Sequence, residues 1–206
     1  MARTLVLFAH PALEKSRVHR ELLRWIPDHP DLTLHDLYEA YPRFHVDVAR
    51  EQELLEDHDV VVFQFPFYWY SPPPLLKQWE DLVLEHGWAY GSEGTALRGK
   101  VASAVVSAGG TRDAYCAEGH NRFSVRQLLA PVEQTCVLCG LRYLPPWVVF
   151  GTHRLSTADI EIHGEAYGDY LRWLVEVGPP GEEVDGLAEL HPEPHRTVGV
   201  EARVGS

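Results

Sequence analysis

Two kinds of hydrophobic spacing alternate along this chain, and their alternation restricts the fold more than any other feature of the sequence. Short runs of consecutive apolar residues are typical of strands buried on both faces. They are separated by segments in which apolar residues recur every three or four positions, as in amphipathic helices. Strands and helices that alternate in this way form a parallel sheet with right-handed crossovers. The sequence therefore predicts a three-layer α/β sandwich with a five-stranded parallel sheet.

The expected elements follow from these spacings and from the turn residues between them. Ser16 is expected to cap the first helix, which ends before Pro27, and Asp47 is expected to cap the second. Residues 1–177 are predicted to form one domain, whereas residues 178–206 are acidic, contain proline and glycine, and are expected to form a mostly irregular tail. The predicted strands span residues 4–9, 31–37 (nearer the sheet edge), 59–65, 101–106 and 146–150, and the predicted helices span residues 16–26, 47–55, 72–83, 124–139 and 156–177.

Composition excludes several classes of function. The chain has 206 residues, of which 45% are hydrophobic, and this is enough for one domain with an ample core. It has 18 Lys and Arg against 30 Asp and Glu, and the resulting formal charge of −12 excludes nucleic acid as an expected partner.

The three cysteines are too few and too clustered to cross-link a domain of this size, so they are expected to be reduced thiols. With no signal-peptide core and no run of about 18 apolar residues, we expect a soluble, cytoplasmic protein. Residues 94–100 (GTALRGK) precede a predicted strand, which excludes a phosphate-binding P-loop.

Ligands of an open parallel sheet bind beyond the carboxyl ends of its strands, where three loops of this chain carry unusual residues. The loop after the first strand lacks the glycines of a dinucleotide-binding turn. It ends at Ser16, however, where the free N–H groups of a helix start favour an anion. His10, Ser16 and Arg17 would add donors for a monophosphate. Taken alone, the commoner explanation is a plain helix cap at Ser16 and a strand end at His10.

The loop after the third strand has the most distinctive composition, because it places five aromatic side chains within six residues and follows them with three prolines. Such a loop would expose a large apolar area unless a flat ligand covered it. The prolines are expected to start the next helix, which makes a polyproline ligand for a partner protein the weaker alternative. Phe65 is expected in the core, and core packing is the alternative for about half of the rings. The sequence thus predicts that Phe67, Tyr68, Trp69 and Tyr70 form one wall of a flavin pocket.

The loop after the fourth strand begins with Ser107, Ala108, Gly109 and Gly110. Paired glycines let the main chain approach a ligand closely, and their N–H groups match the acceptors of a flavin ring. A plain turn is the commoner reason for a Gly-Gly pair on its own. Further along the loop, Tyr115 and His120 are the nearest titratable groups and the candidate catalytic residues.

Two further patterns carry no predicted function. Cys136 and Cys139 form a C-x-x-C at the end of a predicted helix instead of at a helix start, so we expect core residues and not a redox pair. His191 and His195 lie in the predicted tail and suggest no catalytic site, so no metal is predicted.

Several segments together resemble one family. They are AHPALEKSRVHREL, DLYEAYPRFHVDVAREQELL, QFPFYWYSPPPLLKQWEDLVLEHGWAYG, GTALRGK and CGLRYLPPW. Over about residues 3–177 the chain resembles the flavodoxin-like NAD(P)H:quinone reductases, and among them the ancillary subunits of bacterial glutathione-gated potassium efflux systems. The resemblance implies a flavodoxin-like homodimer with FMN, or alternatively FAD, at each of two sites. It also implies a ping-pong reaction in which NAD(P)H donates a hydride and a quinone accepts it.

The same resemblance assigns roles to individual residues. Tyr115 and His120 match a Tyr and a His that assist hydride transfer, with a one-residue gap before His120. This chain departs from many relatives at His19, where they have Asn, and at Ser107-Ala108, where they have two threonines. The implied flavin contacts fall on His10, Ser16, Arg17, Val18, His19, Phe67, Tyr68, Trp69, Tyr70, Ser107, Ala108, Gly109 and Gly110.

Two other functions stay open at this point. The chain could act chiefly as a regulatory subunit that docks on a membrane potassium/proton antiporter, with redox activity secondary, and an acidic surface would suit that role. Reduction of azo or nitro compounds is a weaker option. No motif in the sequence would recognise the 2′-phosphate of NADPH, so the sequence predicts no preference between NADH and NADPH.

Overall fold

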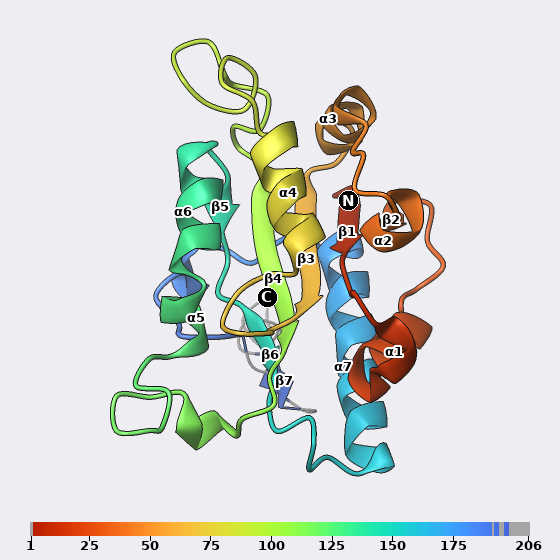
Figure 1. Ribbon diagram of the computed structural model, residues 1–206, viewed down its shortest axis with the longest axis vertical. Coiled ribbons are helices and arrows are strands. Elements are labelled where there is room, and N and C mark those ends of the chain that lie inside the picture. The colour runs from red at the N-terminus through yellow and green to blue at the C-terminus, as the bar shows by residue number, and fades with distance from the viewer. Residues whose placement is uncertain (1, 191, 194–195, 198–206) are drawn as a thin grey trace, which may run out of the picture.

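The computed structural model describes residues 2–190, 192–193 and 196–197 (Figure 1). Its centre is a parallel sheet with the strand order β2–β1–β3–β4–β5, in which β6 also pairs with β4. This arrangement confirms the predicted α/β sandwich and places β2 at an edge of the sheet. The fifth position is divided between two short strands, because Pro145 and Pro146 have no N–H to donate to the ladder. The strands are β1 (Thr4–Phe8), β2 (Leu32–Asp36), β3 (Val60–Pro66), β4 (Val101–Ser107), β5 (Arg142–Tyr143) and β6 (Trp147–Val149).

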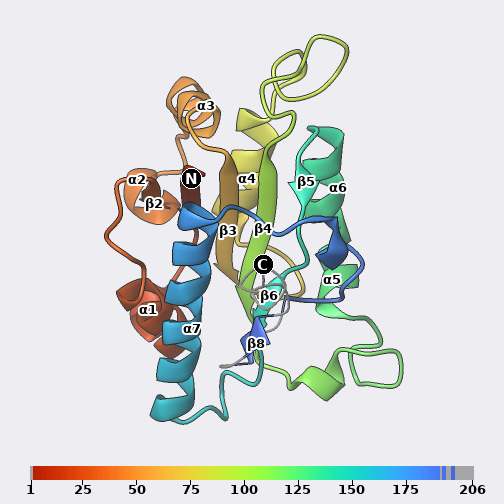
Figure 2. The same ribbon diagram turned by 180° about the vertical axis from the view of Figure 1, so that it is seen from behind.

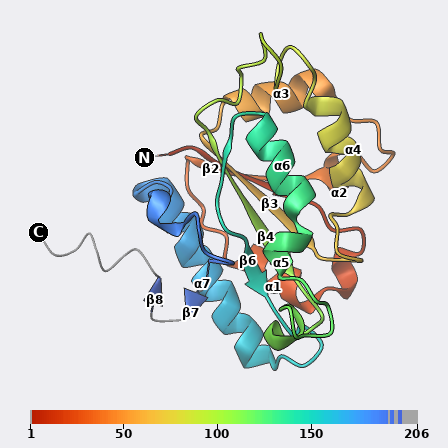
Figure 3. The same ribbon diagram turned by 90° about the vertical axis from the view of Figure 1, so that its left-hand side faces the viewer.

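Helices cover both faces of the sheet (Figure 3). α1 and α7 lie on one face, and α2 to α6 lie on the other. The prediction of a single helix over residues 124–139 is wrong, since Pro131 cannot donate an N–H within a continuous helix and sits instead in the first turn of α6. None of the described helices is both long and apolar enough to cross a lipid bilayer. The helices are α1 (Arg17–Arg24), α2 (Leu37–Ala40), α3 (Val48–Glu56), α4 (Pro74–Val83), α5 (Val125–Leu128), α6 (Ala130–Leu138) and α7 (Thr157–Glu176).

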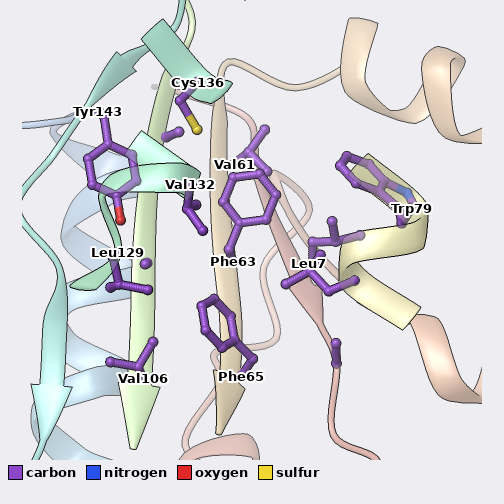
Figure 4. Close-up of a cluster of buried hydrophobic side chains, with 14 of the residues drawn as sticks. Leu7, Val61, Phe63, Phe65, Trp79, Val106, Leu129, Val132, Cys136 and Tyr143 are labelled. Atoms are coloured by element: carbon purple, nitrogen blue, oxygen red, sulfur yellow. The ribbon is translucent and has the colours of Figure 1, made fainter. Parts of the chain in front are cut away.

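Two hydrophobic clusters fill the space between the sheet and the helices. The larger lies under α2 to α6 and contains Phe65 and Trp79 (Figure 4), so the prediction that Phe65 is a core residue is confirmed. The smaller contains Tyr167 and lies under α1 and α7. Cys136 and Cys139 belong to the larger cluster, as expected, and burial raises the pKa of both thiols. Neither cysteine therefore has the character of a reactive thiolate.

The predicted tail begins after α7. Its residues 178–190 turn back across the sheet toward β5 and β6 (Figure 2), and they include the helical turn η3 (Glu182–Val184). Beyond them, β7 (Pro192–Glu193) and β8 (Arg196–Thr197) pair in antiparallel fashion. His191, His195 and residues 198–206 lie outside the described residues.

A buried carboxylate, Glu80 on α4, gives the larger cluster a predictable dependence on pH. Glu80 is 7% exposed, and burial raises its pKa to about 7, with smaller and opposing effects of Lys77 and Asp81. In the unfolded chain this carboxyl ionises near 4.5, so the fold loses stability as the pH rises from about 4.5 to about 7.

We therefore expect Glu80→Gln to raise the free energy of unfolding by about 2–3 kcal/mol at pH 8 and to change it little at pH 5. Urea denaturation at both pH values measures this difference, and Glu53→Gln, at an exposed position of α3, is the control. An equal effect of Glu80→Gln at the two pH values would contradict the explanation.

Candidate functional site

The carboxyl ends of β1, β3, β4 and β6 lie at the lower end of the sheet in Figure 1, and the loops that follow these strands meet there. Three of these loops are the ones predicted from sequence, and the fourth follows β6. Between them lies a cavity of about 200 Å³. Its lining residues are His10, Lys15, Ser16, Arg17, Val18, Phe67, Tyr68, Ser107, Gly109, Thr152 and His153.

The start of α1 forms the cationic end of this cavity. A short helical turn, η1 (Leu13–Lys15), leads into Ser16, whose hydroxyl accepts a hydrogen bond from the N–H of His19 at 3.1 Å. The side chains of Lys15 and Arg17 are exposed, whereas the Val18 side chain is buried, so Val18 can offer a ligand only its main chain. Free N–H groups, the helix dipole and two cations together favour a phosphate at this point.

The aromatic loop after β3 forms a tight turn on the rim of the cavity. The N–H of Ser71 donates to the carbonyl of Tyr68 at 3.2 Å, and the two central residues, Trp69 and Tyr70, have positive φ angles of 50° and 64°. Positive φ costs a bulky residue about 1 kcal/mol or more, and such strain clusters at ligand sites. Trp69 is 92% exposed, whereas Phe67 is buried below the turn. The turn thus presents a large apolar surface to whatever binds there.

The loop after β4 supplies unused main-chain donors. Ala108 is buried. Its N–H donates to the carbonyl of Val149 at 2.8 Å, and its carbonyl accepts from the N–H of Thr152 at 3.2 Å. The N–H groups of Gly109 and Gly110 have no hydrogen-bond acceptor within the described residues. Ala108 therefore anchors the loop, and the two glycines that follow it are able to donate to a ligand.

A buried polar chain lies behind the cavity. His19 Nε2 is 2.9 Å from the Ser107 hydroxyl, the Gln64 amide nitrogen lies 3.4 Å from His19 Nδ1, and Tyr167 donates to Gln64 Oε1 at 2.8 Å. Burial, followed by the nearby ring of His10, lowers the pKa of His19 to about 3. Burial also lowers the pKa of His10, although Glu14 opposes this effect. His19 is therefore neutral, and it orients the Ser107 side chain from behind instead of contacting the cavity.

The two predicted catalytic residues lie on one loop but are not paired. Tyr115 is half-buried, with its ring 6.3 Å from that of Phe67 and 5.7 Å from that of Phe150. Burial raises the pKa of the Tyr115 hydroxyl, and nearby Tyr70 adds to this shift. His120 is exposed, and no hydrogen bond joins it to Tyr115 in the part of the chain that the structure describes.

Four residues of this region were missed by the sequence reasoning. Lys15, Thr152 and His153 line the cavity, and Asn121 Oδ1 accepts a hydrogen bond from the Tyr70 hydroxyl at 3.0 Å, which joins the aromatic turn to the Tyr115 loop. Thr152 and His153 follow the last predicted strand, so the rule that ligands bind beyond strand ends would have found them. Asn121 has no such signal, because its partner is distant in the sequence.

The fold and the site together define the class of protein. A family model described as a flavodoxin-like fold matches residues 2–172, and the chain belongs to this flavodoxin-like family. It is 45% identical over 170 residues to a protein of Bacillus subtilis named as an uncharacterized NAD(P)H oxidoreductase, YrkL, a match covering 82% of this chain and 98% of that relative. It is 42% identical over 180 residues to the glutathione-regulated potassium-efflux system ancillary protein KefG of Cronobacter sakazakii, which covers 87% of this chain and 96% of that relative.

Solved structures agree with this assignment. General stress protein 14 of Treponema denticola, in complex with FMN, is 42% identical with a TM-score of 0.79, covering 84% of this chain and 99% of that one. An NADPH-quinone reductase from P. pentosaceus is 32% identical with a TM-score of 0.74, covering 82% of this chain and 97% of that one.

Proposed function

We propose that this chain is a flavin-dependent oxidoreductase that transfers hydride from NAD(P)H to a quinone by a ping-pong mechanism, with FMN as cofactor and FAD as the alternative. One observation carries the proposal. An anion-binding helix start, an aromatic turn and two glycine N–H groups, for which the described part of the chain offers no acceptor, meet at one sheet edge. The FMN complex of a relative with 42% identity supports it.

Each part of the edge suits a different part of FMN. Ser16, Lys15 and the N–H groups at the start of α1 would hold the phosphate. The rings of Tyr68, Trp69 and Tyr70 would cover the isoalloxazine, which supplies a group able to accept a hydride and pass it on. Gly109 and Gly110 would donate to its acceptor atoms and stabilise negative charge that develops there.

The Tyr115 loop would then serve the acceptor. His120 is exposed, and it would donate a proton to the forming quinol oxygen. Tyr115 lies near the ring of Phe67, and its hydroxyl, held protonated by its raised pKa, would act as a hydrogen-bond donor. NADH and NADPH are both candidates for the donor that binds before the quinone in the same place.

Rapid-mixing experiments test the reaction directly. We expect either NADH or NADPH to bleach the absorbance of the bound flavin without oxygen, and a quinone added afterwards to restore it. Because the donor leaves before the acceptor binds, double-reciprocal plots at several quinone concentrations should be parallel lines. Flavin that neither nucleotide bleaches, or plots that intersect, would contradict this mechanism.

We also propose a homodimer, because the exposed Trp69 and the half-exposed Phe123 would gain burial from a second copy. Sedimentation of the purified protein would show a species of twice the chain mass, and a monomer at all concentrations would contradict it.

A second candidate function is favoured by the similarity to KefG. In this case the chain would be a cytoplasmic ancillary subunit that docks on a glutathione-gated potassium/proton antiporter. Efflux measured with and without the protein separates the two functions. If a variant that cannot bind flavin still activates efflux, docking is the main role and reductase chemistry is dispensable.

A further inference from the structure

We propose that residues 178–190, called here the C-terminal strap, fix the position of the Tyr115 loop (residues 111–121), and that Glu189 is a positioning residue. The inference rests on the proposed function, because Tyr115 matters only if substrates bind beside it. The family model ends at residue 172, and YrkL is matched over 98% of its length by 82% of this chain. The strap therefore lies outside the part that defines the family.

Two arginines of the domain anchor the strap. Arg142, on β5, donates to the Asp185 carboxylate at distances of 2.6 to 3.1 Å and to the carbonyl of Pro180 at 2.6 Å. Arg126, on α5, donates to the carbonyls of Asp185 and Leu187 at 2.5 Å each. Charge-assisted bonds from two planar guanidinium groups fix both position and direction. The strap is therefore held against β5 and α5 by specific contacts.

Apolar side chains and a main-chain bond hold the rest of the strap. Val184 is 1% exposed, and Leu187 and Leu190 pack against the cluster that contains Trp147. The N–H of Leu190 donates to the carbonyl of Pro146 at 2.9 Å, so the end of the strap lies beside β6. Leu190 lies beside the first residue of that strand, and the site loop with Thr152 and His153 follows its last residue.

Glu189 connects this end of the strap to the Tyr115 loop. Its carboxylate pairs with Arg112, in the helical turn η2 (Arg112–Ala114), and the two side chains are 19% and 42% exposed. The guanidinium carbon of Arg112 lies 4.8 Å from the ring centre of Phe150, which in turn lies 5.7 Å from that of Tyr115. The Arg112 guanidinium thus lies between the carboxylate of Glu189 and the face of the Phe150 ring. The Phe150 ring in turn packs against Tyr115.

Loss of the carboxylate has a defined consequence. Without it, Arg112 keeps only its remaining contacts, and the Tyr115 loop opens more often. Within the described residues, no hydrogen bond or ion pair joins the strap to the start of α1, where the flavin phosphate would bind. We therefore expect Glu189→Gln to raise the KM for the quinone, while the Kd for FMN and the maximal rate of flavin reduction stay unchanged.

Hydrogen exchange of the full chain tests the strap without relying on activity. In Glu189→Gln, the amides of residues 111–121 should exchange about fivefold faster, the change expected from losing a partly exposed ion pair. Glu182→Gln is the matched control, because it removes the same charge from an exposed position of the strap. Unchanged exchange in Glu189→Gln, or an equal change in Glu182→Gln, would overturn the inference.

A double variant checks that the effect passes through Arg112. In the background of Arg112→Gln, adding Glu189→Gln should change neither the exchange rate nor the KM any further. A further change would show that Glu189 acts by another route and would contradict the proposal. Hydrogen exchange is measured without flavin, so its result does not depend on the proposed function. A chain that bound no flavin would overturn the proposed function, but the exchange rates would still test the role of the strap.

Discussion

Gly109→Val is expected to weaken FMN binding by about 100-fold or more. Gly109 lies in the wall of the cavity, and a β-carbon at this position would lie 3.0 Å from His153 Nε2. The methyl groups of valine would keep a flat ligand away from the N–H groups of Gly109 and Gly110. Loss of these contacts costs about 3 kcal/mol, which corresponds to the stated change in Kd. Fluorescence titration of the flavin-free variant with FMN measures the effect.

Gly186→Val is the matched control for this substitution. Gly186 is an exposed residue of the C-terminal strap, and a β-carbon there would meet no atom within 4 Å. We expect this variant to bind FMN as tightly as the unmodified chain. Unimpaired binding by Gly109→Val, in a sample whose circular dichroism is unchanged, would show that the glycine loop does not contact the flavin.

Replacing Glu51 is expected to cause the largest loss of stability. Glu51 lies on α3 and is fully buried, and its carboxylate accepts three hydrogen bonds. His35 and Tyr41 donate to Oε1 at 2.8 and 2.5 Å, and Trp79 donates to Oε2 at 2.7 Å. Burial raises the pKa of Glu51, but these hydrogen bonds outweigh it and bring the pKa below its ordinary value. The carboxylate, on α3, therefore links three other parts of the chain, namely β2, the residue that follows α2, and α4.

Glu51→Gln keeps the volume but leaves one acceptor oxygen for three donors. At least one buried donor then faces an amide N–H, and breaking a buried charged network in this way costs about 3 kcal/mol or more. Denaturation by urea at pH 7 measures the loss. The stabilisation by the carboxylate is present above the unfolded pKa of about 4.5 and is lost as the pH falls through the folded value. Glu53→Gln, at an exposed position of the same helix, should change stability by less than about 0.5 kcal/mol, and a similar loss in both variants would contradict the account.

The sequence predicted the elements that depend on local spacing. The continuous apolar run of β3 and the turn residues around it were sufficient to place the strand, the buried Phe65 and the aromatic loop. Because parallel strands all end at the same edge, the meeting of three loops followed from the order of the elements alone. The interruption of the fourth predicted helix was not predicted, although the sequence contains the signal for it. Pro131 restricts where a helix can begin.

Long-range polar contacts could not be predicted in this way. Glu51 and Glu80 look like ordinary surface acids of amphipathic helices, and only the packing of the neighbouring elements shows that they are buried. The Ser107–His19–Gln64–Tyr167 chain joins four elements, and no spacing in the sequence links them. The acidic composition of residues 178–206 suggested solvation, whereas the pairing of Asp185 with Arg142 depends on a tertiary arrangement.

Flavin titration of the unmodified chain tests the central claim most directly. We expect protein purified from cells to be yellow, and the flavin-free protein to take up one FMN per chain, with quenching of flavin fluorescence as the ring stacks on the aromatic turn. A colourless protein that takes up neither FMN nor FAD would contradict the assignment of this sheet edge as a flavin site.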